Sequence, residues 1–127
     1  SGSSGTRGTS GTSGTSGSSG VSSVAYQPLT PTTGAVTWDY NTSPNMTVTI
    51  TGNITLSITN ATSGAFGNLI LTQGGAGGYT ISLPGGSKVA FGGGGTIGLT
   101  GTVNSIDILS WTYDGATYYW SAGYNYT

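Results

Sequence analysis

Apolar and hydroxyl-bearing residues alternate in short runs along most of the chain. The clearest runs are residues 46–51, Met-Thr-Val-Thr-Ile-Thr, and residues 54–59, Ile-Thr-Leu-Ser-Ile-Thr. Because successive side chains of a β-strand point to opposite faces of a sheet, this alternation predicts strands with one buried and one solvated face. Similar runs rich in Val, Ile, Thr, Tyr and Trp predict further strands over residues 24–27, 35–40, 68–73, 79–83, 87–91, 103–113 and 116–122. No segment has helical periodicity, so the pattern predicts an all-β head domain over residues 21–127.

Two dipeptides between these runs predict hairpins. Gly52-Asn53 joins two alternating runs and is typical of a tight turn between paired strands. Asp114-Gly115 is the stronger signal, because this pair accommodates the positive φ angles of a type I′ turn. Together the runs and turns predict an antiparallel β-sandwich or jelly-roll-like head, with an interwoven trimeric arrangement as the open alternative.

Glycine clusters at residues 74–78 and 92–95 fit mobile loops, bulges or places where backbones approach closely. They are not predicted to bind phosphate, because a phosphate-binding loop needs Gly-Lys-Ser or Gly-Lys-Thr ahead of a helix. We therefore expect these glycines to be structural.

The first twenty residues carry a glycine at every third position. These glycines are Gly2, Gly5, Gly8, Gly11, Gly14, Gly17 and Gly20. Only glycine fits at the axis of a collagen triple helix, so the period predicts a collagen-like stem over residues 1–20 and three chains side by side. The alternative is a flexible Gly/Ser/Thr linker or a tag. Because the stem contains no proline, it would melt alone, and the head is expected to act as its trimerisation clamp.

Charged residues make up only 4% of the chain, against about 25% in an ordinary domain. They are Arg7, Asp39, Lys88, Asp107 and Asp114. Two isolated cations cannot replace the counterions of a phosphate backbone, so we expect no nucleic acid partner. No apolar run reaches the length of a membrane span, so we expect no membrane insertion either. The chain starts at Ser1 with no initiating Met or signal peptide, and we expect a processed product or a fragment.

Catalytic chemistry has few candidate groups in this chain. Cys, His and Glu are absent, which excludes disulfides and thiolate metal sites and removes the usual acids, bases and nucleophiles. Asp39 and Asp107 are the only plausible carboxylate pair for glycan hydrolysis, since Asp114 belongs to its turn. We favour Asp107 as a structural hydrogen-bond acceptor. The sequence therefore predicts no enzyme, with no catalytic residue, cofactor or metal site.

Aromatic residues gather near the C-terminus and allow two interpretations. They are Trp111, Tyr113, Tyr118, Tyr119, Trp120, Tyr124 and Tyr126. In the favoured interpretation alternate members fill the core or a subunit interface, since period two places Trp111 and Tyr113 on one face of their strand and likewise gives Tyr118 and Trp120 a shared face. In the other, an exposed member, Tyr119, Tyr124 or Tyr126, contacts a receptor glycan at the distal tip.

Five Asn-x-Ser/Thr sequons offer possible glycosylation sites. They begin at Asn41, Asn45, Asn53, Asn60 and Asn125. In so Ser- and Thr-rich a chain about two would arise by chance, so five is an enrichment. Occupied sites would indicate a glycosylated surface and an origin in, or a virus of, an organism with asparagine-linked glycosylation. Empty sites would fit a bacterial phage.

The second half of the chain, residues 68–127, resembles the C-terminal domains of bacteriophage tail-fibre and related virion fibre proteins. The matching blocks are Leu-Ile-Leu-Thr-Gln at 69–73, Tyr-Thr-Ile-Ser-Leu-Pro at 79–84, Ile-Asp-Ile-Leu at 106–109 and Tyr-Asp-Gly-Ala-Thr-Tyr-Tyr at 113–119. The resemblance implies a collagen-like shaft followed by a trimeric all-β knob. This chain departs from the group in its near absence of charge and its Ser/Thr-only stem.

Two functional hypotheses follow. The first is a homotrimeric fibre head on a virion or extracellular surface, where it serves attachment or decoration and contacts a cell-surface glycan. The second is a subunit of a self-assembling extracellular filament, in which residues 21–29 act as a donor strand for the next subunit. A closed trimer and an open-ended filament differ in symmetry, which makes the two distinguishable. A free lectin-like module is a third, weaker option.

Overall fold

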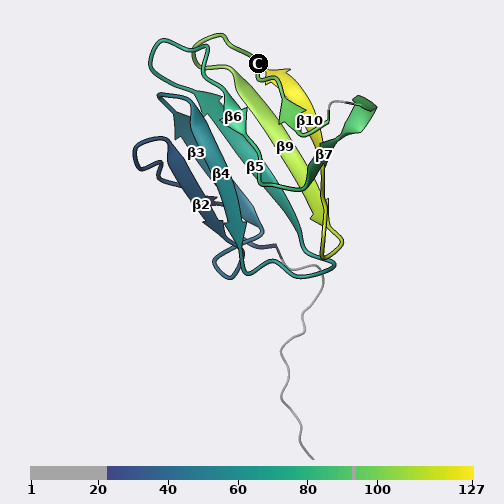
Figure 1. Ribbon diagram of the computed structural model, residues 1–127. Helices are drawn as coiled ribbons and strands as arrows, with labels where there is room; N and C mark the ends of the chain where they lie inside the picture. The colour runs from purple at the N-terminus through teal and green to yellow at the C-terminus, as the bar shows by residue number, and fades with distance from the viewer. Residues whose placement is uncertain (1–22, 93) are drawn as a thin grey trace, which may run out of the picture.

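The computed structural model describes residues 23–92 and 94–127, which form a sandwich of two β-sheets (Figure 1). The six-stranded sheet has the order β1-β3-β5-β9-β10-β7, and the four-stranded sheet has the order β2-β4-β6-β8. The predicted collagen-like stem at residues 1–20 lies outside the described residues. The elements are β1 (Gln27–Pro28), β2 (Ala35–Asp39), β3 (Asn45–Ile50), β4 (Ile54–Thr59), β5 (Phe66–Gln73), β6 (Ile81–Ser82), β7 (Ser87–Val89), the 3₁₀ turn η1 (Ala90–Gly92), β8 (Thr96–Ile97), β9 (Ile106–Tyr113) and β10 (Tyr118–Tyr126).

The all-β prediction is confirmed. The prediction of antiparallel sheets is wrong, because both sheets contain parallel as well as antiparallel pairs. The pairs β1/β3, β3/β5 and β10/β7 are parallel in one sheet, and β2/β4 and β4/β6 are parallel in the other. From β2 to β9 each strand lies in the sheet opposite to the strand before it. In the pairs β1/β3, β2/β4, β3/β5 and β4/β6, strands two apart in sequence are therefore neighbours and run in the same direction, whereas β6 and β8 pair antiparallel.

The hairpin predicted at Gly52-Asn53 is wrong. These residues carry the chain from β3 in one sheet to β4 in the other, and neither residue has the positive φ that a type I′ turn requires. Each of the two runs has one apolar face, as predicted, but the faces meet across the core instead of lying side by side. Alternation alone does not distinguish these arrangements, because both bury the same residues.

The hairpin at Asp114-Gly115 is confirmed. β9 and β10 pair antiparallel, with Tyr113 opposite Tyr118. The turn differs from the type I′ expectation, because it spans residues 114–117 and only Gly115 has a positive φ, at 98°. The Asp114 carboxylate accepts hydrogen bonds from the backbone N–H groups of Ala116 at 2.8 Å and Thr117 at 2.7 Å. These hydrogen bonds from the backbone to the Asp114 side chain stabilise the turn.

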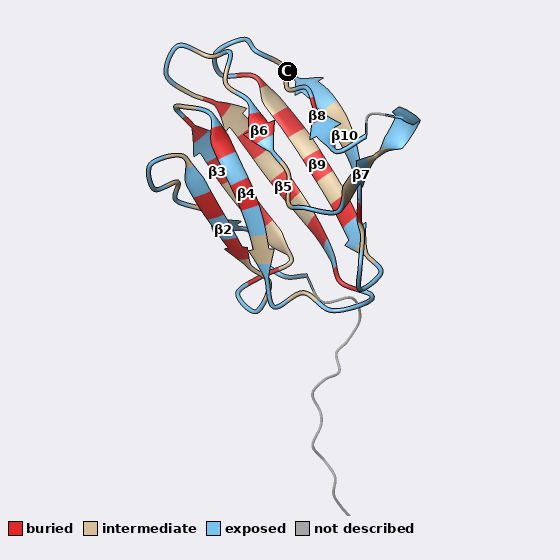
Figure 2. Cartoon of the chain, in the orientation of Figure 1, coloured by how far each residue is buried: buried red, intermediate tan, exposed pale blue. Residues whose placement is uncertain are grey.

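The core lies between the two sheets and is built from every second residue of the longer strands (Figure 2). Trp111 stands at its centre, with ring centroids 5.4 Å from Trp38, 5.7 Å from Tyr40 and 5.5 Å from Tyr118. Trp120 is buried beside them. The favoured interpretation of the C-terminal aromatics, in which alternate members fill the core, is confirmed for Trp111, Tyr118 and Trp120.

Several predicted strands are shorter in the structure. The run at 79–83 contributes only β6, and the run at 87–91 contributes only β7 before the chain turns into η1. β8 was not predicted, because its two residues lie beside the glycine-rich segment. Within the described part of the chain there is no helix with the length and hydropathy needed to cross a membrane.

Candidate self-association surface

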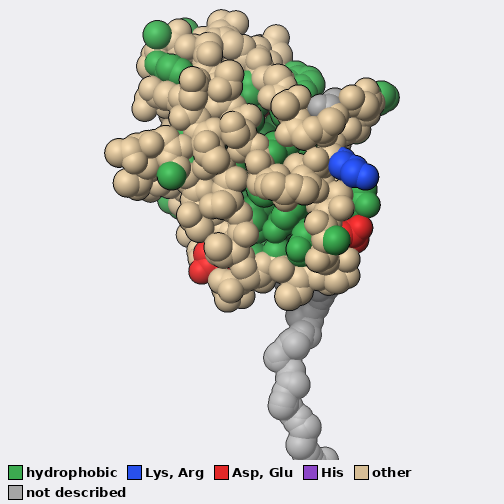
Figure 3. All heavy atoms as spheres, viewed as in Figure 1, with side chains coloured by type: hydrophobic (Ala, Val, Ile, Leu, Met, Phe, Trp, Pro, Cys, Tyr) green, Lys and Arg blue, Asp and Glu red, His purple; other side chains and the backbone are tan. Residues whose placement is uncertain are grey.

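The outer faces of the two sheets have different chemistry. On the four-stranded sheet the outward positions carry small or hydroxyl side chains and one carboxylate. They are Ala35, Thr37, Asp39, Thr55, Ser57, Thr59, Ser82 and Thr96. Figure 3 views the molecule from this side, where backbone and uncharged polar atoms surround a patch of hydrophobic side chains in the middle of the view. The outward positions of the four strands are suited to contact with water.

On the six-stranded sheet the outward positions include six large apolar or aromatic side chains. They are Phe66, Ile70, Ile106, Ile108, Tyr119 and Tyr126, which we call the apolar face. Strand register places them in rows, since Ile70 pairs with Ile108, Ile106 pairs with Tyr126, and Thr112 stands between Phe66 and Tyr119. Phe66 is 57% exposed and Tyr126 is 51% exposed. Large apolar side chains on one outer face of a sheet indicate a contact surface.

A hydrogen-bonded polar row crosses the apolar face. Ser110 Oγ donates to Asn68 Oδ1 at 2.8 Å, and Asn68 Nδ2 donates to Asn45 Oδ1 at 3.1 Å. Asn45 Nδ2 donates to the carbonyl oxygen of Val24 at 2.8 Å. The row is neutral and satisfies its own groups, so its burial costs little. It also fixes the start of the described chain against this face.

Charge is nearly absent from the face. Of the four charged residues in the described chain, only Lys88 lies in these rows, on the edge strand β7 opposite Tyr119. In a symmetric assembly, copies of the same residue meet near the symmetry axis, and like charges in contact repel. A neutral face avoids that repulsion and is suited to a second copy of the same chain.

Asp39 and Asp107 have separate hydrogen-bond partners. Asp39 Oδ1 accepts from the backbone N–H of Asn41 at 3.0 Å and from Asn60 Nδ2 at 2.8 Å. Asp107 is 1% exposed, and its carboxylate accepts hydrogen bonds from the N–H groups of Thr100 at 2.7 Å and Asn125 at 2.9 Å. Its predicted role as a structural acceptor is confirmed.

Two buried polar side chains pin the loops at the end of the sandwich where β5 ends and β9 begins. Asp107 joins the loop at Thr100 to the C-terminal segment at Asn125. The Gln73 amide donates to the carbonyl oxygen of Tyr79 at 2.9 Å and accepts from its N–H at 3.2 Å. These bonds hold the loops in one arrangement. We call this end the distal end, because Val24 lies at the other.

The three tyrosines predicted to contact a glycan are all exposed but are not together. Tyr119 lies beside the β9–β10 turn, where its hydroxyl donates to Asp114 Oδ2 at 3.1 Å, and it stands at the end opposite to the distal loops. Tyr126 lies at the distal end, with its ring over Gly123. Tyr124 is 50% exposed in the β-bulge that interrupts the end of β10. A glycan contact at the distal tip stays a prediction, now confined to Tyr124 and Tyr126.

The sequon asparagines differ in accessibility. Asn41, Asn53 and Asn125 are exposed, and their side-chain nitrogens donate no hydrogen bond to another described residue. Asn45 Nδ2 donates to Val24 and Asn60 Nδ2 donates to Asp39 at 2.8 Å, so these two nitrogens are engaged. Glycosylation stays a prediction at all five positions, and the fold favours the three free ones.

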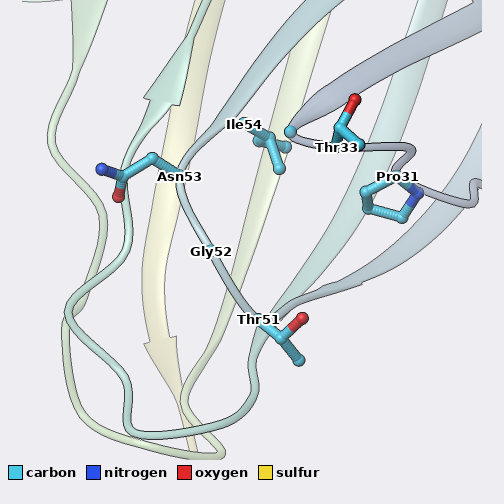
Figure 4. Close-up of a pocket in the computed structure, with 7 residues that line it drawn as sticks. Pro31, Thr33, Thr51, Gly52, Asn53 and Ile54 are labelled. Atoms are coloured by element: carbon cyan, nitrogen blue, oxygen red, sulfur yellow. The ribbon is translucent and has the colours of Figure 1, made fainter.

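A shallow pocket of about 260 Å³ lies between the loops at residues 31–34 and 51–54 (Figure 4). Its lining residues are Pro31, Thr33, Gly34, Thr51, Gly52, Asn53 and Ile54. None of them is titratable, and the Asn53 side chain points away from the other lining side chains in Figure 4. Elsewhere in the described residues, no three Asp side chains or other metal-binding groups gather at one point. The pocket offers no catalytic chemistry.

No family model, curated protein or solved structure matches this chain. The apolar face therefore has to be interpreted from its own chemistry. The alternation of apolar and polar residues did not predict the apolar face, but consecutive apolar residues in two strands indicate it. Leu69-Ile70-Leu71 and Ile108-Leu109 are consecutive apolar residues, and such runs are typical of strands buried on both faces.

Proposed function

We propose that this chain is a homotrimeric fibre head of a virion or an extracellular fibre, and that the apolar face is its subunit interface. The observation that carries the proposal is the placement of Ile70 and Ile108 side by side on the outside of the central strands β5 and β9. These side chains have no second sheet of their own chain to cover them. The period-three glycines of residues 2–20 give the number of chains, since a collagen-like stem contains three.

The dimensions of the sheet are compatible with a three-sided arrangement. Six strands at a spacing of about 4.8 Å span about 24 Å. In a triangular prism with sides of about 24 Å, each sheet stands about 7 Å from the axis, which is close to half of the roughly 10 Å that separates packed sheets. Side chains of three apolar faces would fill this space without a channel. The hydroxyl-rich faces would all point to solvent.

The proposed role is attachment or decoration, with no enzymatic step. Val24, near the start of the described chain, lies toward one end of the head, and the pinned loops, Tyr124 and Tyr126 lie at the other. Loops held on a rigid scaffold are where recognition residues usually lie. In the proposed trimer Tyr126 belongs to the interface, so Tyr124 is the tyrosine left for a glycan.

One observation favours the filament as a second candidate. Residues 24–29 lie along the edge of their own β3, where Leu29 N–H donates to the Thr47 carbonyl oxygen at 2.8 Å and β1 pairs in parallel. Five of these six residues are exposed, so the segment is held mainly by a few hydrogen bonds. An edge segment of this kind can dock on the next subunit instead of its own.

The mass of the undenatured particle, measured by light scattering, tests both candidates. We expect a discrete species at three times 12.6 kDa, retained after removal of residues 1–20, because the interface belongs to the head. A monomer at micromolar concentration would overturn the trimer. Open-ended polymers that are lost when residues 21–29 are also removed would establish the filament instead.

A further inference from the structure

The loop after β7 carries a fully exposed aromatic residue. Phe91 is as accessible as in an extended peptide, at 107% relative exposure, so the other described residues do not cover its ring. The base of the loop is closed by a hydrogen bond from Val89 N–H to the Gly94 carbonyl oxygen at 2.7 Å. In Figure 1 the loop extends sideways from the β7 edge, away from the body of the sandwich. The ring is thus presented outward on a closed loop.

The same residue also has an unfavourable backbone conformation. Its φ of 64° and ψ of 26° lie in the left-handed region, which is disfavoured for a bulky side chain. Glycine would adopt this conformation freely, and the neighbouring residues Gly92, Gly94 and Gly95 show that the loop is otherwise built from glycine. A residue that is both strained and exposed breaks two local rules at once, and such positions are expected at functional sites.

The opposite edge of the same sheet carries complementary exposed residues. β1 lies at one edge and β7 at the other, about 24 Å apart across five strand spacings. On the β1 edge Val24 is 49% exposed and Tyr26 is 42% exposed. The two apolar sites cannot meet within one chain. They can meet only between copies.

We propose that the Phe91 loop of each chain docks against Tyr26 and Val24 on the β1 edge of the next chain. This inference rests on the proposed trimer and adds a contact at each corner of its three-sided arrangement. In a three-sided prism the β7 edge of one sheet meets the β1 edge of its neighbour at each corner. A contact between two different surfaces, repeated by a three-fold rotation, closes into a ring. An aromatic ring inserted beside another aromatic and a valine is a typical anchor of such an interface.

The test is a disulfide cross-link between Tyr26→Cys and Phe91→Cys in the full-length chain. The natural sequence contains no cysteine, so every disulfide comes from the introduced pair. A disulfide needs Cα atoms within about 7 Å, and the intrachain separation across the sheet excludes a bond within one chain. The matched control combines Phe91→Cys with Ser57→Cys, which lies on the solvent face of β4. Both proteins are oxidised mildly and separated by non-reducing denaturing electrophoresis.

We expect the Tyr26/Phe91 pair to convert most of the protein to covalent trimers, and the Ser57/Phe91 pair to stay at the level of single-cysteine variants. A particle with the mass of a trimer that gives no more cross-link than the control would overturn the corner contact while the trimer stands. A monomeric wild-type particle would overturn the proposed function and this contact together. A ladder of covalent species beyond three would support the Phe91 contact and replace the closed trimer by a filament.

Discussion

Trp111 owes its place at the centre of the core to a glycine on the neighbouring strand. Gly67 pairs with Trp111 across β5 and β9, and the indole ring fills the space where a side chain at position 67 would stand. A Cβ there would lie 2.6 Å from Nε1, 2.7 Å from Cε2 and 2.8 Å from Cζ2 of Trp111. The ring is 3% exposed and is surrounded by Trp38, Tyr40 and Tyr118. The indole ring is therefore enclosed and cannot easily shift to make room for a side chain at position 67.

Gly67→Ala is therefore expected to lower the free energy of unfolding by about 1–3 kcal/mol, the usual cost of overpacking a core. Gly85→Ala is the matched control, because a Cβ at Gly85 would have no atom within 4 Å. Its effect should stay within about 0.5 kcal/mol. Urea denaturation of both variants at one protein concentration measures the difference. Equal stability of the two variants would show that Trp111 can repack.

The β9–β10 hairpin depends on the carboxylate of Asp114. Hydrogen bonds from the backbone N–H of Thr117 and then of Ala116 hold the pKa of Asp114 below its ordinary value of 3.8. Because the folded chain binds this proton less tightly than the unfolded chain, ionised Asp114 favours the folded state. That contribution is complete above the ordinary pKa and is lost as the pH falls through the lower pKa of the folded state.

Asp114→Asn should consequently flatten the acid side of the stability profile. The amide oxygen of Asn can still accept from the two N–H groups, but it does not titrate. Melting temperatures of wild type and variant, measured from pH 7 to pH 2, should differ most above the ordinary pKa of 3.8 and converge as the pH falls below it. A constant difference across this range would show that the charge of Asp114 is irrelevant to the hairpin.

At the scale of the whole molecule, the contrast between the two outer faces decides how the sandwich meets its surroundings. One face presents hydroxyl groups, and the other presents isoleucines and aromatic rings around a neutral polar row. Hydroxyl groups keep their water, whereas the apolar face gains free energy when it is covered. The proposed association through the six-stranded sheet would cover the apolar face and leave the hydroxyl groups in water.

Ile108→Asp is expected to convert the trimer to monomers, because three buried carboxylates would meet near one axis without partners. Ser57→Asp places the same charge on the outer face of β4 and should leave the trimer intact. Light scattering gives the mass of both variants, and circular dichroism shows that both stay folded. A trimeric Ile108→Asp variant would exclude the apolar face as the interface.

Sequence patterns predicted those parts of the fold that depend on local chemistry. Alternation located the long strands, and Asp114-Gly115 located the β9–β10 hairpin, because side-chain direction and turn conformation are properties of neighbouring residues. The role of Asp107 as a structural acceptor and the burial of Trp111 also followed from the chain itself. The consecutive apolar residues at 69–71 and at 108–109 also indicated that the outer face of β5 and β9 carries apolar side chains.

Only the tertiary structure decided which strands pair and which residues stand together. The same alternating runs fit a hairpin or two facing sheets, since both bury Val48 and Leu56, and the crossing at Gly52 resolves this choice. Long-range packing also decides that Tyr119 and Tyr126 lie apart and that Asp39 and Asp107 have different hydrogen-bond partners. It likewise leaves Phe91 exposed in a strained conformation. Residue spacing along a chain determines the face on which a side chain lies, whereas its distant neighbours depend on how the whole chain folds.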